Sequence, residues 1–279
     1  MIRTAMTVAA IAAISGSAMA QTITGAGGNA TFAYNAGATP TSPTASAVSG
    51  SANLDANGAA AGGDSLFATW WHYRVDNDTR EFTYHAPANP FVAAGDTMTA
   101  TFNLPSAAPS FRSELRYQIS DPDGAGTATA LLQQYNRITN TSSTTRVLNV
   151  FSYADFDPNG SFSHPYSYDA GRQAFTGASG PVTFFYKGFG ANAYQANDFS
   201  TLRGLLEDAA VTNLNNTVDG PGQSGTGDFT GAFQWTLTLA PGQSIELLSV
   251  LSLNTEPVPA PGALALVGVA GLAGLRRRR

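Results

Sequence analysis

The chain has 279 residues, with 19 acidic side chains, 14 basic side chains and no cysteine. The lack of cysteine excludes disulfides, thiolate metal sites and thiol catalysis. Between Gln21 and Pro257, nine basic side chains stand against 19 acidic ones, which leaves about ten net negative charges (19 − 9). This balance disfavours nucleic acid as a partner, because nucleic-acid binding relies on Lys and Arg at the phosphates.

The first twenty residues have the three parts of a secretory signal peptide. Arg3 supplies a positive charge, residues 5–14 form a short apolar run, and Ala18-Met19-Ala20 ends in small residues. We therefore expect cleavage between Ala20 and Gln21 and export of the remaining chain. The alternative is an ordinary N-terminal helix.

The segment 21–64 is rich in Gly, Ala, Ser and Thr, and we expect loop or loosely held edge structure there, with one strand at 30–34. From Ser65 the chain becomes aromatic and β-prone. Residues 66–75 and 80–85 flank the turn Asp76-Asn77-Asp78-Thr79, which predicts a hairpin.

Further apolar or alternating runs predict strands at 97–104, 113–120, 128–139, 146–153, 182–186, 229–239 and 244–253. The Pro241-Gly242 turn predicts that the last two strands pair as a hairpin. Apolar residues at helical spacing predict one short helix within 198–208. The whole pattern predicts an all-β fold, an antiparallel β-sandwich with one short inserted helix, over 65–254.

The segment Asp155-Phe156-Asp157-Pro158-Asn159-Gly160 has the form of the first half of a calcium-binding loop. Oxygen ligands at alternate positions can converge on a hard cation, and the glycine allows the tight turn. Position twelve of such a loop requires Glu but holds Tyr166, so a calcium ion at Asp155, Asp157 and Asn159 would need a distant ligand such as Asp169. The alternative is a β-turn without a metal.

No set of residues predicts a catalytic site. His72 and His85 lie on strands that could pair, but without a carboxylate at a diagnostic offset we interpret them as structural histidines. Glu81 and Glu114 would serve as a glycosidase pair only if the fold brought them together. We therefore expect the protein not to be an enzyme.

Trp70, Trp71 and Tyr73 could form a platform for sugar stacking. Neighbouring residues of a strand point to opposite faces, so both tryptophans cannot join one surface. We expect these three side chains to pack in the core.

The C-terminal tail, residues 255–279, combines a proline-rich motif, an apolar run at 262–275 and four arginines at 276–279. Basic residues stay on the cytoplasmic side of a membrane, so this order predicts a stop and orientation signal. As a helix, the apolar run would span about 21 Å, less than the roughly 30 Å hydrocarbon core, which favours a transient membrane tether over a lasting anchor. The residues of the predicted sorting motif are Glu256, Pro257, Val258, Pro259, Ala260, Pro261 and Gly262.

This tail resembles the PEP-CTERM sorting signal of environmental bacteria, with Thr255-Glu256-Pro257 where that family has Pro-Glu-Pro. The resemblance implies a membrane-embedded exosortase-type protease as a partner, and a protein exported to the cell surface or beyond it. Retention or cleavage of the tail stays open at this point.

The body resembles an uncharacterised group of PEP-CTERM proteins. The matching stretches lie at 66–75, 153–157, 211–217 and 231–235. This resemblance implies no activity. It implies an exported β-rich structural protein, often associated with extracellular polysaccharide and biofilm matrix. The alternatives are a calcium-dependent carbohydrate-binding module and a secreted enzyme that acts on polysaccharide.

Overall fold

The computed structural model describes residues 21–34, 40, 42–45, 52–56, 64–105, 108–124, 126–220 and 222–257. The predicted signal peptide up to Ala20 and the tail from Val258 onward lie outside these residues. Within the described part of the chain, no helix is long and apolar enough to cross a membrane.

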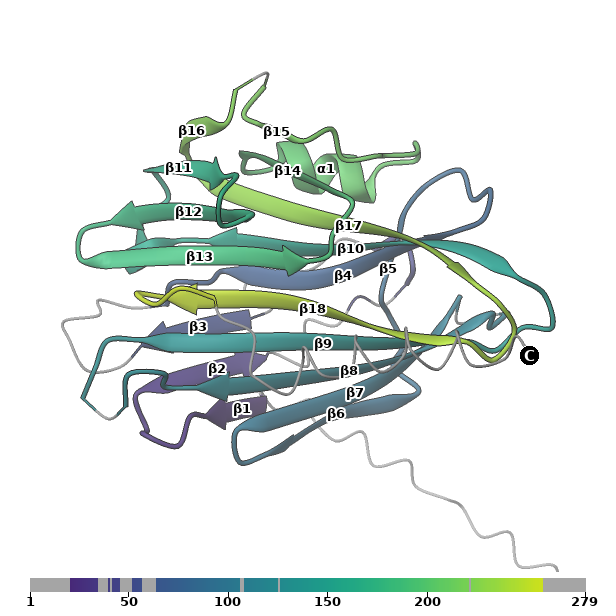
Figure 1. Cartoon of the computed structure of the whole chain (residues 1–279), viewed down its shortest axis with the longest axis horizontal. Coiled ribbons are helices and arrows are strands. Elements are labelled where there is room, and N and C mark those ends of the chain that lie inside the picture. Colours follow the sequence, from purple (N-terminus) through teal and green to yellow (C-terminus); the bar gives the residue numbers. More distant parts are fainter. Residues whose placement is uncertain are drawn as a thin grey trace, which may run out of the picture.

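The larger layer is a sheet of nine strands in which every paired neighbour runs antiparallel (Figure 1). Its strands, in order across the sheet, are β16 (Ser224–Gly227), β11 (His164–Asp169), β12 (Ala174–Ser179), β13 (Val182–Phe189), β18 (Ser244–Leu253), β9 (Ala130–Asn140), β8 (Phe111–Ser120), β7 (Thr97–Leu104) and β6 (Asn89–Ala94).

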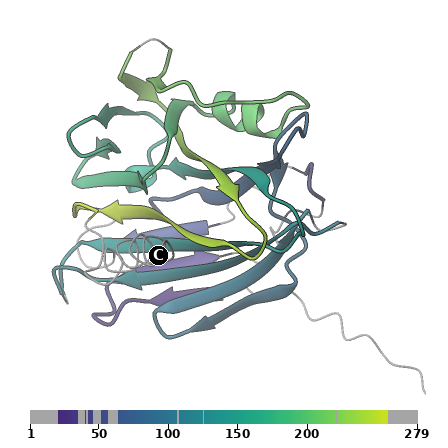
Figure 2. The same cartoon turned by 45° about the vertical axis from the view of Figure 1, so that its right-hand side comes forward.

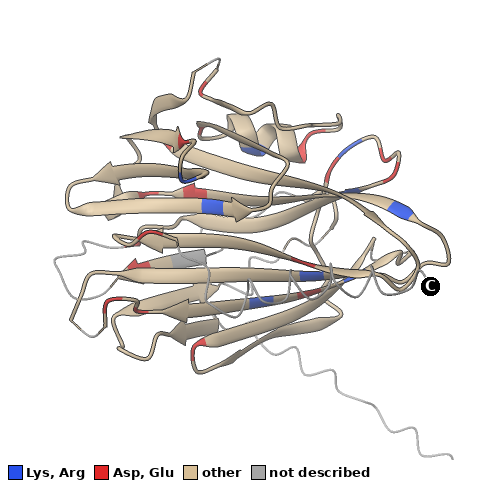
Figure 3. Ribbon diagram, viewed as in Figure 1, with Lys and Arg blue, Asp and Glu red and all other residues tan. Residues whose placement is uncertain are grey.

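Two smaller sheets accompany it. One has six strands in the order β15 (Thr217–Val218), β14 (Ala193–Asp198), β17 (Phe229–Leu239), β10 (Arg146–Phe156), β4 (Ala68–Val75) and β5 (Phe82–Thr83). The other has three strands in the order β1 (Gln21–Thr24), β2 (Ala30–Tyr34) and β3 (Ala52–Ala56). Figure 2 shows the sheets from a second direction, and Figure 3 shows charged residues scattered along them.

Apolar contacts between the nine-stranded and six-stranded sheets form the core. Phe156 of β10 stacks on Phe184 of β13 with ring centroids 4.5 Å apart. The buried Tyr186 hydroxyl donates a hydrogen bond to the Ser152 carbonyl oxygen across the same interface (2.6 Å). The expected all-β fold with sheets packed as a sandwich is therefore confirmed.

The predicted strands 229–239 and 244–253 have the expected bounds, but the predicted hairpin is wrong. β17 pairs with β10 and β14, whereas β18 pairs with β9 and β13, so the turn at 240–243 crosses between layers. A Pro-Gly turn reverses the chain without determining which strand lies beside it. Here the buried Asn140 holds both ends of the turn. Its side chain donates a hydrogen bond to the Leu239 carbonyl oxygen (2.7 Å), and its backbone N–H donates one to the Gln243 carbonyl oxygen (2.9 Å).

The segment 21–64 contains two strands that its composition did not predict. β1 and β3 flank β2, and Ile23, Phe32 and Leu54 are fully buried. The Phe32 ring stacks on Tyr117 of β8 with centroids 5.5 Å apart. The three-stranded sheet therefore shares the main core, because its large side chains, though few, all point inward.

The other local predictions are confirmed. β4 and β5 form the expected hairpin, with a short second strand. The single described α-helix, α1 (Thr201–Glu207), lies within the predicted range. Leu202 and Leu206 of α1 pack in a cluster with Phe151, on the face of the six-stranded sheet that is turned away from the main core.

Candidate metal centre

The register of β10 and β17 brings two aspartates together at one end of the six-stranded sheet. The last antiparallel pair joins Phe156 of β10 to Phe229 of β17. Asp157 comes directly after Phe156 and Asp228 directly before Phe229, so the two aspartates lie across from each other just beyond this pair. Asp155 precedes Asp157 by two residues and therefore lies on the same side of the strand. In the sequence several strands lie between Asp157 and Asp228. The pairing of β10 with β17 is what brings Asp228 next to Asp155 and Asp157.

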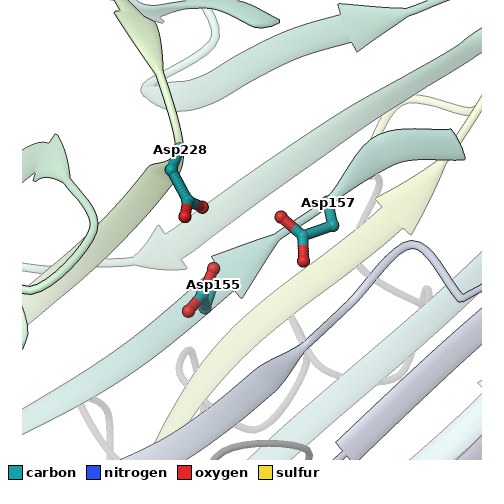
Figure 4. Close-up of side chains that lie close together, drawn as sticks. All are labelled: Asp155, Asp157 and Asp228. Atoms are coloured by element: carbon teal, nitrogen blue, oxygen red, sulfur yellow. The ribbon is translucent and has the colours of Figure 1, made fainter. Parts of the chain in front are cut away.

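The three carboxylates point toward one another (Figure 4). One oxygen from each of Asp155, Asp157 and Asp228 lies within 4.8 Å of the others. Asp155 is 2% exposed and Asp157 is 5% exposed, and the Oδ1 atom of each is buried without a hydrogen-bond partner. A buried carboxylate oxygen without a partner costs free energy, so this arrangement favours a proton or a cation at the cluster.

The backbone fixes the segment that carries these side chains. Phe67 N–H donates to the Asp155 carbonyl oxygen (2.9 Å), and Asp157 N–H donates to that of Ser65 (3.2 Å). Gly160 N–H closes the following turn on the Asp157 carbonyl oxygen (2.8 Å). Asp228 N–H donates to the Asp198 carboxylate (2.6 Å), which places a fourth acidic side chain beside the cluster.

The electrostatics follow from burial and mutual repulsion. Burial, and then the charge of Asp228, raise the pKa of Asp157 to about 6. Burial, followed by the charges of Asp157 and Asp228, raises the pKa of Asp155 well above its usual range. Burial and the charge of Asp198 raise the pKa of Asp228. Arg203 of α1 opposes the effect at Asp155 but does not reverse it.

The donor set fits a hard divalent cation. Calcium binds carboxylate oxygens at about 2.3–2.6 Å, so two ligands of one ion lie at most about 5 Å apart. The 4.8 Å limit on the three aspartate oxygens meets this condition. All the donors are oxygens, which suits calcium or magnesium better than a soft metal. The cluster can therefore hold a metal ion.

The structure brings together two of the three predicted ligands and adds one that the sequence did not indicate. Asp155 and Asp157 join Asp228, whose only signal was its position just before a predicted strand. The side-chain nitrogen of Asn159 faces Gly180, and the role of Asn159 as a ligand stays a prediction. Asp169 accepts a hydrogen bond from Gly171 N–H (2.8 Å) and pairs with Arg172.

The three histidines are buried, and two of them have ring nitrogens without a hydrogen-bond partner, Nε2 of His164 and both nitrogens of His72. Both ring nitrogens of His72 are inaccessible and have no hydrogen-bond partner. Burial lowers the pKa of His72 to about 4, which keeps the ring neutral. In the described residues, Asp155, Asp157 and Asp228 are the group placed to hold a metal, and no histidine belongs to it.

Of the two candidate glycosidase carboxylates, Glu81 directly precedes a strand of the six-stranded sheet and Glu114 lies on the nine-stranded sheet. Glu81 is buried beside β5, pairs with Arg74 and accepts a hydrogen bond from Thr212 N–H (3.1 Å). Glu114 is on β8 and pairs with the exposed Arg112 (3.0 Å). Trp70, Trp71 and Tyr73, the aromatic residues considered for sugar stacking, are at most 1% exposed, so their expected packing in the core is confirmed.

The described residues include only the borders of the predicted processing sites. Gln21 begins β1, whereas Ala20 lies outside the described residues. Glu256 forms an ion pair with Arg172 (2.8 Å), and Pro257 is buried. The rest of the predicted motif, Val258 to Gly262, lies outside the described residues.

No family model and no curated protein matches this chain. Among solved structures, it is similar to a bacterial glucoamylase in complex with acarbose, with a TM-score of 0.58 and 10% identity, over 91% of this chain and 35% of the glucoamylase. The chain thus spans about a third of that enzyme. It also matches a putative aldose 1-epimerase from Escherichia coli K12, with a TM-score of 0.39 and 11% identity, over 84% of this chain and 98% of that one. A polysaccharide lyase matches with a TM-score of 0.40 and 12% identity, over 71% of this chain and 26% of the lyase.

The glucoamylase likeness corrects one expectation. We expected the protein not to be an enzyme, and this is contradicted because the same fold forms part of a carbohydrate-active enzyme. At 10% identity the likeness is one of fold, and it assigns no reaction and no catalytic residue to this chain.

Proposed function

We propose that this chain is an exported β-sandwich protein of the cell surface or extracellular matrix that associates with carbohydrate. We further propose that it binds one calcium ion at Asp155, Asp157 and Asp228. The observation that carries the calcium site is the pair of buried aspartate oxygens without a hydrogen-bond partner, which face a third carboxylate. A divalent cation would remove both the mutual repulsion and the cost of burial.

The carbohydrate association has weaker support. It rests on the fold shared with a glucoamylase that was solved with acarbose, together with the sequence resemblance of the body. Export, transient tethering to the inner membrane and sorting by an exosortase-type protease rest on the two ends of the chain.

We propose a structural rather than a catalytic use of the acidic cluster. A glycosidase needs its carboxylates at the wall of a cleft where a sugar can reach both. Asp155 and Asp157 are 2% and 5% exposed, so a glycan cannot lie between them. A cation at this position would instead tie the end of β10 to the start of β17.

Calcium titration followed by thermal melting tests the cation site. At ten times the dissociation constant, binding stabilises the folded state by about 1.4 kcal/mol, which corresponds to a rise in Tm of about 3–5 °C for a chain of this size. We expect this rise in the unmodified protein and its loss in Asp155→Asn. Asp123→Asn, a change in the exposed Asp-Pro-Asp-Gly turn, is the matched control and should keep the rise. An unmodified protein whose Tm does not move in millimolar calcium would rule out the site.

Electrophoresis through gels that contain soluble polysaccharides tests the carbohydrate association separately. We expect at least one acidic or neutral polysaccharide to retard the protein, and Asp155→Asn to be retarded less if calcium shapes the binding surface. A calcium-dependent Tm without retardation by any polysaccharide would keep the cation site and reject the carbohydrate role.

A further inference from the structure

The nine-stranded sheet carries a second apolar cluster on its outer face, the face turned away from the six-stranded sheet. Side chains alternate along β9 and β18, so that Leu132 and Leu251 enter the main core while Tyr135 and Val250 point the other way. We call this set the outer-face cluster; its members are Leu131, Tyr135, Phe189, Leu248 and Val250.

Burial on this face increases toward the end of β18. Glu246 is exposed, Leu248 is 9% exposed, and Val250 and Ser252 are completely buried. The main contacts of β9 and β18 with other described elements are β8 and β13 beside them and β2 and β3 in the other layer. These elements lie in the same sheet or on its inner side, and Val250 on the outer face is nevertheless completely buried.

The chain turns toward this face when it leaves β18. Ser252 Oγ donates to the Thr255 carbonyl oxygen (2.7 Å), and Glu256 pairs with Arg172 (2.8 Å). The Arg172 carbonyl oxygen accepts a hydrogen bond from Lys187 Nζ (2.6 Å), and Lys187 lies directly beside Val250 on the outer face. The last described residue, Pro257, is buried.

The residues that follow match this face in character and in length. Twenty-two residues follow Pro257 (279 − 257), and 262–275 contain only Gly, Ala, Val and Leu. As a helix these fourteen residues would be about 21 Å long, enough to cross about four strands spaced about 4.8 Å apart. An uncovered apolar cluster of this kind would favour association or aggregation.

We propose that the apolar segment Gly262–Leu275 docks on the outer-face cluster of its own chain. The domain then holds the segment away from water until a membrane takes it up. This docking does not depend on the calcium site or on carbohydrate binding. Only its use in sorting depends on the proposed export.

The absence of cysteine allows a direct test on residues 21–279, with the tail intact, in detergent-free buffer. Val250→Cys and, as a smaller change, Ser252→Cys place single thiols under the proposed contact. Glu246→Cys places the matched control on the same face of the same strand, where the side chain is exposed. The rate of maleimide labelling is measured for each variant, with and without Leu266→Glu and Val269→Glu in the tail.

We expect the thiols at 250 and 252 to react at least about tenfold more slowly than the thiol at 246, as buried positions do when they open rarely. The two tail substitutions should abolish this difference without changing the circular dichroism spectrum. Equal labelling at 246 and 250 in the unmodified tail would overturn the proposal. Protection that survives the tail substitutions would also overturn it, and so would protection that disappears on dilution, because a second copy would then be the cover.

Discussion

At the scale of single residues, the aspartates show how position changes chemistry. Asp76 lies at the surface, where Arg146 and Val147 N–H hold its carboxylate in the charged form. Asp155 and Asp157 have the same side chain in a buried place beside further negative charge, and their pKa values rise. The sequence marks all three as turn-forming acids, and only the neighbours distinguish them.

The raised pKa of Asp157 predicts how stability depends on pH in the calcium-free protein. In the unfolded chain this group has its ordinary value near 3.8, whereas in the fold the pKa is about 6. The folded state therefore binds the proton more tightly, and the stabilisation is lost as pH rises through the window from about 4 to about 6. A shift of this size corresponds to at most about 3 kcal/mol.

Asp157→Asn tests this effect, because Asn resembles the protonated carboxyl. The variant also removes the charge that helps to raise the pKa of Asp155. Asn carries no charge at any pH, so in the presence of a chelator the variant should be more stable than the unmodified protein near pH 7. Near pH 4, where Asp157 is protonated in the fold, the two proteins should be about equally stable. The quantity to compare is the difference in the free energy of unfolding between the two proteins at each pH. Burial lowers the pKa of His72 to about 4, so His72 makes the stability of both proteins rise with pH over the same window, and the difference removes this contribution. Urea unfolding at several pH values gives the two curves. Parallel curves would contradict the assigned environment of Asp157.

At the scale of elements, α1 illustrates how a weak local signal is sufficient when packing supports it. The helix is only seven residues long, has no side-chain N-cap hydrogen bond, and contains Gly204. Isolated helices of this length do not form in water. Leu202 and Leu206 hold it against the sheet through the cluster that contains Phe151 and Ala232.

Two substitutions in α1 should act in opposite directions. Leu206→Ala should destabilise the protein by about 2–4 kcal/mol, because it leaves a cavity in a fully buried contact. Gly204→Ala should stabilise it by about 0.5–1 kcal/mol, because Gly204 is exposed and a methyl group there would meet no neighbouring atom within 4 Å. Chemical denaturation of both variants measures the pair. A stabilising Leu206→Ala would mean that the helix is not held by this contact.

At the scale of the whole molecule, three sheets share one core. The three-stranded sheet places Tyr34 on Trp70 of β4, with ring centroids 5.4 Å apart, and Phe32 on Tyr117 of β8. It therefore contacts both larger sheets. The predicted division into a segment 21–64 and a sandwich 65–254 stays a prediction about organisation, but the packing joins the two.

This shared core predicts a single unfolding transition. Phe32→Ala should destabilise the entire protein by about 3–5 kcal/mol, whereas Thr31→Ala, on the half-buried side of the same strand, should cost less than about 1 kcal/mol. Tryptophan fluorescence and circular dichroism should give coincident curves in urea. An early transition confined to one probe would show that the three-stranded sheet unfolds separately.

The sequence by itself determined the all-β class, most strand positions, the short helix and two members of the acidic cluster. These depend on alternation, turn residues and local spacing, which act over a few neighbouring residues. The tertiary structure alone decided that β17 and β18 separate into different layers, that residues 21–56 contribute a third sheet, and that Asp228 completes the cluster. Each of these depends on which distant strand lies alongside and in which register, and a turn or a composition carries no information about its distant partner.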